Sequence, residues 1–127
     1  MEQTDKELLL KDICARLPYS IKASYYGAEE ECETWDEIEC VTLDGYVDIG
    51  QYILPIESIR PYLFPLSSMT DEQEKEYNNL NGYELGCFPH TEEALDYLIK
   101  NHFDYRGLIE KSLALDATNS GIYDDAK

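Results

Sequence analysis

Basic residues are scarce in this sequence and are missing altogether from its central part. The 127 residues include 10 Lys and Arg against 27 Asp and Glu, which gives a net charge of −17. Residues 23–58 contain ten acids and no base. A field of this sign repels nucleic acid and anionic membranes and attracts basic surfaces. Direct binding to nucleic acid or membrane is therefore excluded, although acidity alone also keeps a small protein soluble.

Long apolar runs and cysteine pairs are missing as well. No stretch approaches the roughly 20 apolar residues that a membrane span needs, and residues 1–5 do not resemble a secretory signal. We therefore expect a cytoplasmic protein whose cysteines are reduced. The spacing of the cysteines and histidines fits no zinc pattern, so we expect buried free thiols and neither a metal nor another cofactor. The thiols are those of Cys14, Cys32, Cys40 and Cys87.

Catalytic signatures are also missing. The sequence contains no Walker loop, GxGxxG, HExxH, GxSxG or EF-hand motif. Cys87 and His90 are close enough in sequence for a thiol–imidazole pair, and His102 lies two residues before Asp104. Such short spacings are common by chance. We predict that the protein is not an enzyme, with Cys87–His90 chemistry as the weakest alternative.

The composition nevertheless predicts a folded chain. Hydrophobic residues make up 43% of it, and the 11 Tyr argue against disorder. We expect a single domain over residues 1–127, with a frayed tail after about residue 119 in which Ile122 and Tyr123 fold back onto the domain. Apolar residues at helical spacing predict an N-terminal helix that begins with a capping box at Thr4 and ends at Pro18.

Residues 20–54 predict a three-stranded antiparallel meander, a unit found in small SH3-like barrels. Asp44-Gly45, between two apolar runs, is typical of a type I′ hairpin turn. The returning strand is expected over residues 46–54. Period-two alternation assigns the apolar residues to one face of each strand. That face consists of Ile21, Ala23 and Tyr25 in the first strand, and of Ile38, Cys40 and Thr42 in the second.

Helices are expected to follow the sheet. Residues 60–66 are apolar but interrupted twice by proline, which indicates an extended segment packed over the sheet, as core or as contact surface. Thr70 and Thr91 predict capped helices over residues 71–81, with Tyr77 and Leu80 inward, and over about 92–101. Residues 104–117 predict a short helix or packed loop. The predicted fold class is α+β, with an N-terminal helix, the antiparallel meander and two or three C-terminal helices.

The acidic stretch also predicts a surface for a protein partner. Alternate residues of an extended chain share a face at about 6.6 Å, so carboxylates at positions 29, 31 and 33 form a row that loosely resembles phosphates. Aromatic residues beside such a row are typical interface anchors. The alternative is a charged strand edge that prevents association. The predicted partner-binding residues are Glu29, Glu30, Glu31, Glu33, Trp35, Asp36, Glu37, Glu39, Tyr25 and Tyr26.

Three stretches resemble a family of short uncharacterised proteins encoded by Bacteroidetes bacteria and by their phages and prophages. They read LLLKDICARLPY over residues 8–19, IESIRPYLFPLSSMTD over 56–71 and DYLIKNHFDYRGLIEKSLALDA over 96–117. The resemblance implies a bacterial cytoplasm and a mobile-element setting, but no activity. The resulting hypothesis is a phage-associated, anti-defence inhibitor that mimics nucleic acid and occupies the basic groove of a host defence protein. The alternative is an accessory or structural domain whose acidity serves only solubility.

Overall fold

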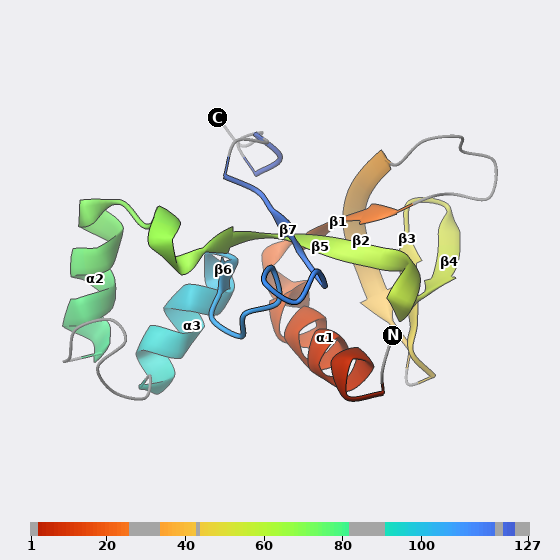
Figure 1. Ribbon diagram of the computed structural model, residues 1–127, viewed down its shortest axis with the longest axis horizontal. Coiled ribbons are helices and arrows are strands. Elements are labelled where there is room, and N and C mark those ends of the chain that lie inside the picture. Colours follow the sequence, from red (N-terminus) through yellow and green to blue (C-terminus); the bar gives the residue numbers. More distant parts are fainter. Residues whose placement is uncertain (1–2, 26–33, 43, 82–90, 119–120, 124–127) are drawn as a thin grey trace.

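The structure is a computed structural model that describes residues 3–25, 34–42, 44–81, 91–118 and 121–123 (Figure 1). Its helices in this part are α1 (Gln3–Arg16), α2 (Asp71–Asn81) and α3 (Glu92–Lys100). Its strands are β1 (Lys22–Tyr25), β2 (Thr34–Val41), β3 (Tyr46–Ile49), β4 (Tyr52–Pro55), β5 (Ile59–Pro65), β6 (Phe103–Asp104) and β7 (Leu115–Asp116). Short 3₁₀ turns cover Leu17–Tyr19, Ile56–Ser58 and Leu66–Ser68.

The strands form a mixed sheet in the order β4-β3-β2-β1-β5-β6, with β7 also paired to β5. Pairs among β1 to β5 are antiparallel, whereas β6 and β7 run parallel to β5. With α1 before the sheet and α2 and α3 later in the chain, this arrangement confirms the predicted α+β class. The sheet is nevertheless larger than the predicted three-stranded meander.

One reason for the larger sheet is that residues 60–66 supply most of β5. Ile59, Pro61 and Leu63 are buried and alternate with more exposed residues, as expected for a strand with one face in the core. β5 pairs with β1 on one side and with β6 and β7 in its second half. The segment predicted to pack over the sheet is therefore part of the sheet, and its residues Pro61 and Leu63 face the core.

The other reason is a second hairpin within residues 46–54. The predicted single strand is divided into β3 and β4 by a turn at Gly50, whose φ of +61° lies in the left-handed region. Asp44-Gly45 does connect β2 to β3, which confirms the first hairpin. Gly45 has a φ of +87°, but Asp44 does not have a positive φ, so the predicted type I′ turn is wrong. Gly45 N instead donates to Thr42 O at 3.1 Å.

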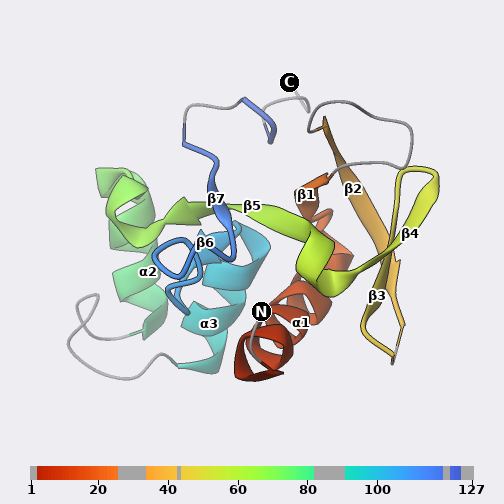
Figure 2. The same ribbon diagram turned by 45° about the vertical axis from the view of Figure 1, so that its right-hand side comes forward.

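Helix α1 covers one face of the sheet, and α2 and α3 lie beyond β6 at the end remote from β4 (Figures 1 and 2). Leu9 and Ile13 of α1 are fully buried in a core cluster that includes Ala23 and Ile49 of the sheet. A second cluster, around Tyr77, Ala94, Leu98 and Phe103, joins α2 and α3 to β6. The two clusters leave the opposite face of β2, β3 and β4 without a helical cover (Figure 2).

Local capping chemistry fixes the N-terminal ends of α2 and α3. Thr70 N donates to Gln73 Oε1 at 2.9 Å and Gln73 N donates to Thr70 Oγ1 at 3.1 Å, which is the predicted capping box. Thr91 caps α3 by accepting from Ala94 N. Thr4, in contrast, lies inside α1 and does not cap it. No helix in the described part combines the length and apolar character needed to cross a membrane.

Candidate functional site

The face of the sheet that points away from α1 carries exposed apolar side chains. Trp35 pairs with Ser24 and Glu37 pairs with Lys22, whereas Asp36 between them pairs with Ala23, whose side chain is in the core. Trp35 and Glu37 therefore point to the opposite face. We call this side of β2 to β4 the outer face. Its side chains are those of Trp35, Glu37, Cys40, Tyr46, Asp48 and Ile53.

Apolar exposure on the outer face is concentrated in three side chains. Trp35 is 46% exposed, Tyr46 is 45% exposed and Ile53 is 69% exposed. Asp48 lies opposite Ile53 across β3 and β4. Trp35 is among the predicted partner-binding residues, whereas Tyr46 and Ile53 are not, because residues 46–54 were predicted as a single strand. Recognising Gly50 as a turn would have restored the alternation that turns Ile53 outward.

A β-bulge in β2 determines which side chains reach the outer face. Ile38 pairs with Ile49 whereas Cys40 pairs with Asp48, so the register shifts between positions 38 and 40. The shift places Cys40 outward and turns Val41 toward the core. The predicted shared face of Ile38 and Cys40 is therefore wrong, because a bulge inserts one unpaired residue and reverses the alternation beyond it.

The described acids of β2 do not form a single row. Asp36, Glu37 and Glu39 are all exposed, as a solvent-facing acid should be. Asp36 pairs with Ala23 on the α1 side, however, and its Oδ1 accepts from the Glu37 backbone N at 2.7 Å, while Glu37 points to the outer face. The remaining predicted acids, with Tyr26, lie outside the described residues. These are Glu29, Glu30, Glu31 and Glu33.

Tyr25 was predicted to contact a partner and is instead a core residue. It is 6% exposed and lies in the main core cluster, with its ring 6.0 Å from that of Tyr52. The alternation that identifies β1 explains this position, because Tyr25 shares the face of Ile21 and Ala23. Of the predicted aromatic anchors, Trp35 is the described one that is exposed.

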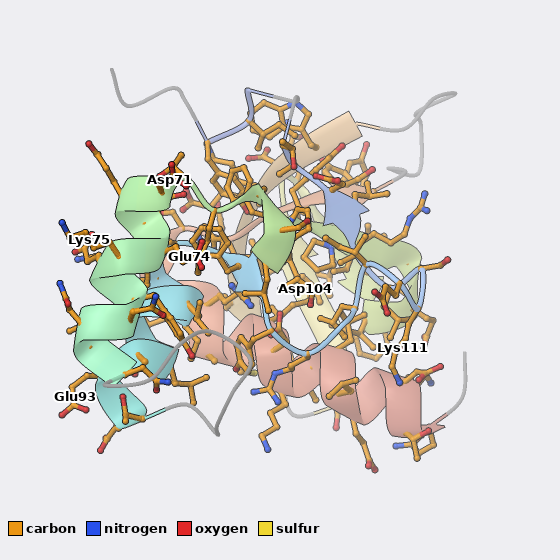
Figure 3. All side chains as sticks on the ribbon, turned by 60° about the vertical axis from the view of Figure 1, so that its left-hand side comes forward. Asp71, Glu74, Lys75, Glu93, Asp104 and Lys111 are labelled. Carbon is orange, nitrogen blue, oxygen red and sulfur yellow. The ribbon has the colours of Figure 1, made fainter. Side chains whose placement is uncertain are left out.

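A second acidic surface lies on the helical pair α2–α3. Figure 3 shows Asp71, Glu74, Lys75 and Glu93 projecting from these helices. The acids there are exposed, and Lys75 and Lys100 are the exposed bases among them. The predicted functional charge lies in residues 29–39, and no role was predicted for this surface. Its exposed acids are Asp71, Glu72, Glu74, Glu76, Glu92, Glu93 and Asp96.

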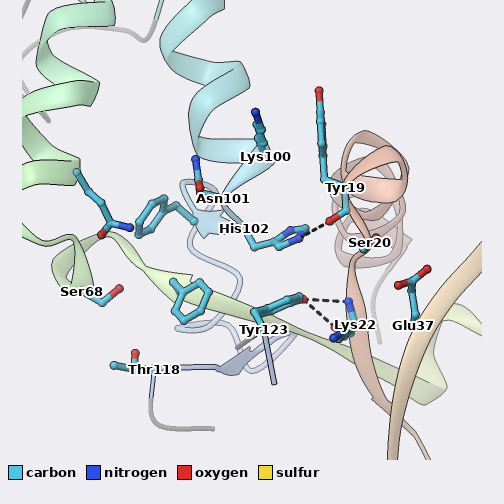
Figure 4. A pocket seen from close by; sticks show the side chains of 13 residues that line it. Tyr19, Ser20, Lys22, Glu37, Ser68, Lys100, Asn101, His102, Thr118 and Tyr123 are labelled. Carbon is cyan, nitrogen blue, oxygen red and sulfur yellow. Dashed lines mark hydrogen bonds between the residues drawn. The ribbon is translucent and has the colours of Figure 1, made fainter. Parts of the chain in front are cut away.

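A pocket of about 720 Å³ lies beyond the outer face, between the C-terminal end of α3, β1 and the C-terminal segment (Figure 4). Its described lining includes the aromatic side chains of Tyr19, Phe64 and Tyr123 and the ammonium groups of Lys22 and Lys100. The pocket therefore combines apolar rings with positive charge in a protein that is otherwise strongly negative.

His102 is the central polar residue of this pocket. It is 5% exposed, its Nε2 lies 2.8 Å from Tyr19 O, and its ring stacks on Tyr123 with centroids 4.6 Å apart. A carbonyl oxygen only accepts, so Nε2 carries the hydrogen. Burial lowers the pKa of His102 to about 4, which leaves the ring neutral at pH 7. Nδ1 is then a buried acceptor without a hydrogen-bond partner in the described structure.

The C-terminal segment closes one side of the pocket. Tyr123 Oη accepts from Lys22 N at 2.9 Å and donates to Tyr62 O at 2.9 Å. Lys22 Nζ donates to Ile122 O at 2.9 Å and lies 5.6 Å from the Tyr123 ring centroid. Burial raises the pKa of the Tyr123 hydroxyl. These contacts confirm the expectation that Ile122 and Tyr123 fold back onto the domain.

Two other polar clusters have structural roles. Asp12 of α1 accepts from Arg16 Nε at 2.9 Å and from Arg106 Nε at 3.2 Å, and Arg16 also donates to Phe103 O at 2.6 Å. Asp104 accepts from backbone N–H groups of the following turn, so it is not the acid of a dyad with His102. The network around Asp12 ties α1 to the C-terminal third of the chain.

The remaining predicted chemistry is only partly visible. Cys87 and His90 lie outside the described residues, as does Cys32. Cys14 and Cys40 are exposed, so the expectation of buried thiols is wrong for both. Within the described ranges, no group of three or more His, Cys, Asp or Glu side chains is arranged to hold a metal ion.

Comparisons with known proteins add no information to these observations. No family model, curated protein or solved structure matches the chain.

Proposed function

We propose that this protein acts by binding a basic surface of another protein through the outer face. The observation that carries the proposal is the exposure of Trp35, Tyr46 and Ile53 on one side of the sheet. Large exposed apolar side chains within a polar surface are characteristic of protein interfaces. Fully burying such a side chain is worth about 1.5–3 kcal/mol, so half-exposed ones retain roughly 1 kcal/mol each for binding.

Charge around these side chains defines the chemistry of the partner. The three strands β2, β3 and β4 contain no Lys or Arg, and Glu37, Glu39 and Asp48 lie beside the apolar residues. Negative charge would raise the rate of association with a basic surface, and the apolar contacts would hold the complex. Basic grooves that bind nucleic acid are protein surfaces of matching charge, because they neutralise phosphates with Lys and Arg.

The biological setting of the proposal comes from the sequence resemblance. A phage- or prophage-encoded protein that occupies the nucleic-acid groove of a host defence protein would act as an inhibitor without any catalysis. We infer that this protein is such an inhibitor, and Glu29, Glu30, Glu31 and Glu33, which lie outside the described residues, stay predicted partner-binding residues.

One observation favours a second candidate function. The acids of α2 and α3 form another exposed surface on a different part of the molecule, and Asp36 and Glu37 point to opposite sides of the sheet. Charge distributed over unrelated faces is what solubility alone requires. In that case the protein is an accessory or structural domain, and Ile53 and Trp35 have no partner.

Binding to purified nucleic-acid-handling proteins of a Bacteroidetes host, at low and high salt, tests the proposal. An inhibitor should bind one of them, release it as salt rises and prevent it from retaining nucleic acid. Ile53→Ser should weaken binding about tenfold. Leu80→Ser is the matched control and should bind as the wild type does, since Leu80, which was wrongly predicted to face inward, is an exposed apolar residue on α2.

Charge reversal separates the two candidate functions. The double variant Glu39→Lys with Asp48→Lys alters the acids of β2 and β3, whereas Glu72→Lys with Glu93→Lys makes the same change of charge on α2 and α3. The sheet variant should lose binding and the helix variant should keep most of it. Equal losses would show that only net charge matters, and no binding by any host protein would leave the solubility role.

A further inference from the structure

The C-terminal segment interrupts the pairing of β1 with β5. Ala23 pairs with Pro61, and the same register places Lys22 opposite Tyr62. Proline has no N–H, so the pair that contains it is a non-hydrogen-bonded one, and the next pair would exchange backbone hydrogen bonds. The Tyr123 hydroxyl is inserted there instead, because its Oη accepts from Lys22 N and donates to Tyr62 O, each at 2.9 Å (Figure 4).

The same segment, residues 121–123, also holds the side chain of Lys22. This side chain is largely buried, and its Nζ donates to Ile122 O at 2.9 Å. The ammonium lies 5.6 Å from the ring centroid of Tyr123 and 5.3 Å from that of Trp35, within the range of cation–π attraction for both rings. A lysine side chain loses rotamer freedom when it is ordered in this way. The position of the ammonium therefore depends on contacts that the C-terminal segment supplies.

The Trp35 ring depends in turn on Lys22. The two residues are diagonal neighbours on β2 and β1, because Trp35 pairs with Ser24 whereas Lys22 pairs with Glu37. Diagonal neighbours on one face are within reach of long and aromatic side chains. Because Trp35 is exposed, the ammonium orders its ring where burial does not. A cation–π contact at an exposed ring favours the held orientation by a factor of about two to five.

We propose that the C-terminal segment controls the outer face by holding Lys22, which in turn orients the Trp35 ring. The docked segment gives the binding-competent state for two reasons. It preorganises an aromatic anchor, which lowers the cost of ordering that side chain on binding. It also keeps the ammonium of Lys22 buried, whereas release of the segment would expose a positive charge beside Glu37 and weaken attraction to a basic partner. The effect on binding rests on the proposed function, but the coupling of the segment to Trp35 does not.

Acrylamide quenching of the fluorescence of Trp35, the single tryptophan, tests the coupling in the full chain. Tyr123→Phe removes the hydroxyl bridge and keeps the ring, and Lys22→Met removes the ammonium and keeps an apolar side chain of similar length. Each should raise the quenching constant of Trp35 roughly twofold, because the ring is no longer held. Lys22→Arg retains a cation that can stack on the ring and should be quenched as the wild type is.

The matched controls are Tyr19→Phe and Lys100→Met, which make the same chemical changes in the turn after α1 and at the end of α3. Both should be quenched as the wild type is. The proposal is overturned if folded Tyr123→Phe is quenched as the wild type is, if Lys22→Arg is quenched as Lys22→Met is, or if the controls change as much as the test variants. If Tyr123→Phe fails to fold, Ile122→Ala replaces it under the same criteria, because it loosens the segment by truncating a buried side chain.

A binding measurement separates this proposal from the proposed function. The probe is the host nucleic-acid-handling protein that the wild type binds in the test described above. Tyr123→Phe and Lys22→Met should weaken this binding about fivefold, and the two controls should not. Unchanged binding by both test variants would overturn control of the outer face by the segment. If no host protein binds the wild type, the proposed function fails, and the quenching measurements still decide whether the segment positions Trp35.

Discussion

Acidification should destabilise this protein through His102. Burial lowers the pKa of the imidazole from 6.5 to about 4; the hydrogen bond to Tyr19 opposes this, and the charges of Arg16 and Lys22 reinforce it. The unfolded chain takes up a proton near pH 6.5, whereas the folded chain does not do so until about pH 4. Because the unfolded state binds more protons in this window, the free energy of unfolding falls as the pH falls through it.

The size of the effect follows from the two pKa values of His102. The difference between 6.5 and about 4 corresponds to about 3 kcal/mol when complete, and about 2 kcal/mol of it develops between pH 7 and pH 5. Tyr123, which stacks on the ring, stays neutral because burial raises its pKa, so the imidazole is the member of this stacked pair that changes its charge.

Urea denaturation at pH 7 and pH 5, followed by the fluorescence of the single tryptophan, measures the effect. The comparison needs His102→Asn, because asparagine tolerates the left-handed backbone and does not titrate. The two proteins have the same acids, so the difference isolates position 102. Wild type and the control His90→Asn should lose about 2 kcal/mol more than His102→Asn between the two pH values. Parallel losses in all three proteins would refute the reasoning.

Three further predictions concern stability. Arg16→Met removes the buried partner of Asp12 and should lower the free energy of unfolding by about 3–5 kcal/mol; a loss below about 1 kcal/mol in urea denaturation would contradict the pairing. Gly45→Ala should lower the free energy of unfolding by about 1 kcal/mol, because this residue has a positive φ. Gly50→Ala should lower it by clearly more, because the added Cβ would also collide with the buried Tyr25 hydroxyl. Equal thermal shifts would be evidence against that collision. Thr70→Ala should cost about 1 kcal/mol by loss of the capping box, and an unchanged melting temperature would argue against the cap.

Local chemistry made parts of the fold predictable. The caps at Thr70 and Thr91 and the stop at Pro18 depend on residues within one helical turn, so the sequence contains all the information that fixes them. The hairpin at Asp44-Gly45 is equally local, although its exact turn type depends on backbone angles that the dipeptide does not determine.

The rest of the fold could not be predicted, because it depends on pairing between residues that are far apart in sequence. Two prolines concealed β5, because proline lowers strand propensity even where the sheet does not need its N–H. The bulge in β2 has no sequence signal, since it depends on how β3 pairs with Ile38 and Cys40. Tyr25 was assigned to a binding surface although its alternation with Ala23 placed it in the core. The aromatic character of Tyr25 suggested a binding anchor, whereas the strand periodicity was the better guide to its position.

The pocket could not be predicted for the same reason, because its walls come from residues more than 100 positions apart in sequence. Lys22 N and Tyr123 Oη, 101 positions apart, are 2.9 Å apart in space. Lys22 points away from α1, as Trp35 does, and its Nζ lies 5.3 Å from the Trp35 ring centroid and 5.6 Å from that of Tyr123.

Lys22 therefore marks the boundary between two regions on the same side of the sheet. Residues 121–123 lie on that side, opposite α1 (Figure 1). Over β1 and β5 they bury Lys22 and complete the pocket, whereas β2 to β4 keep Trp35 and Ile53 exposed. A segment that covers only half of the face separates the pocket from the exposed apolar residues of β2 to β4, and Glu37 borders both regions. The pocket needs the segment in place, while the outer face needs β2 to β4 to remain uncovered.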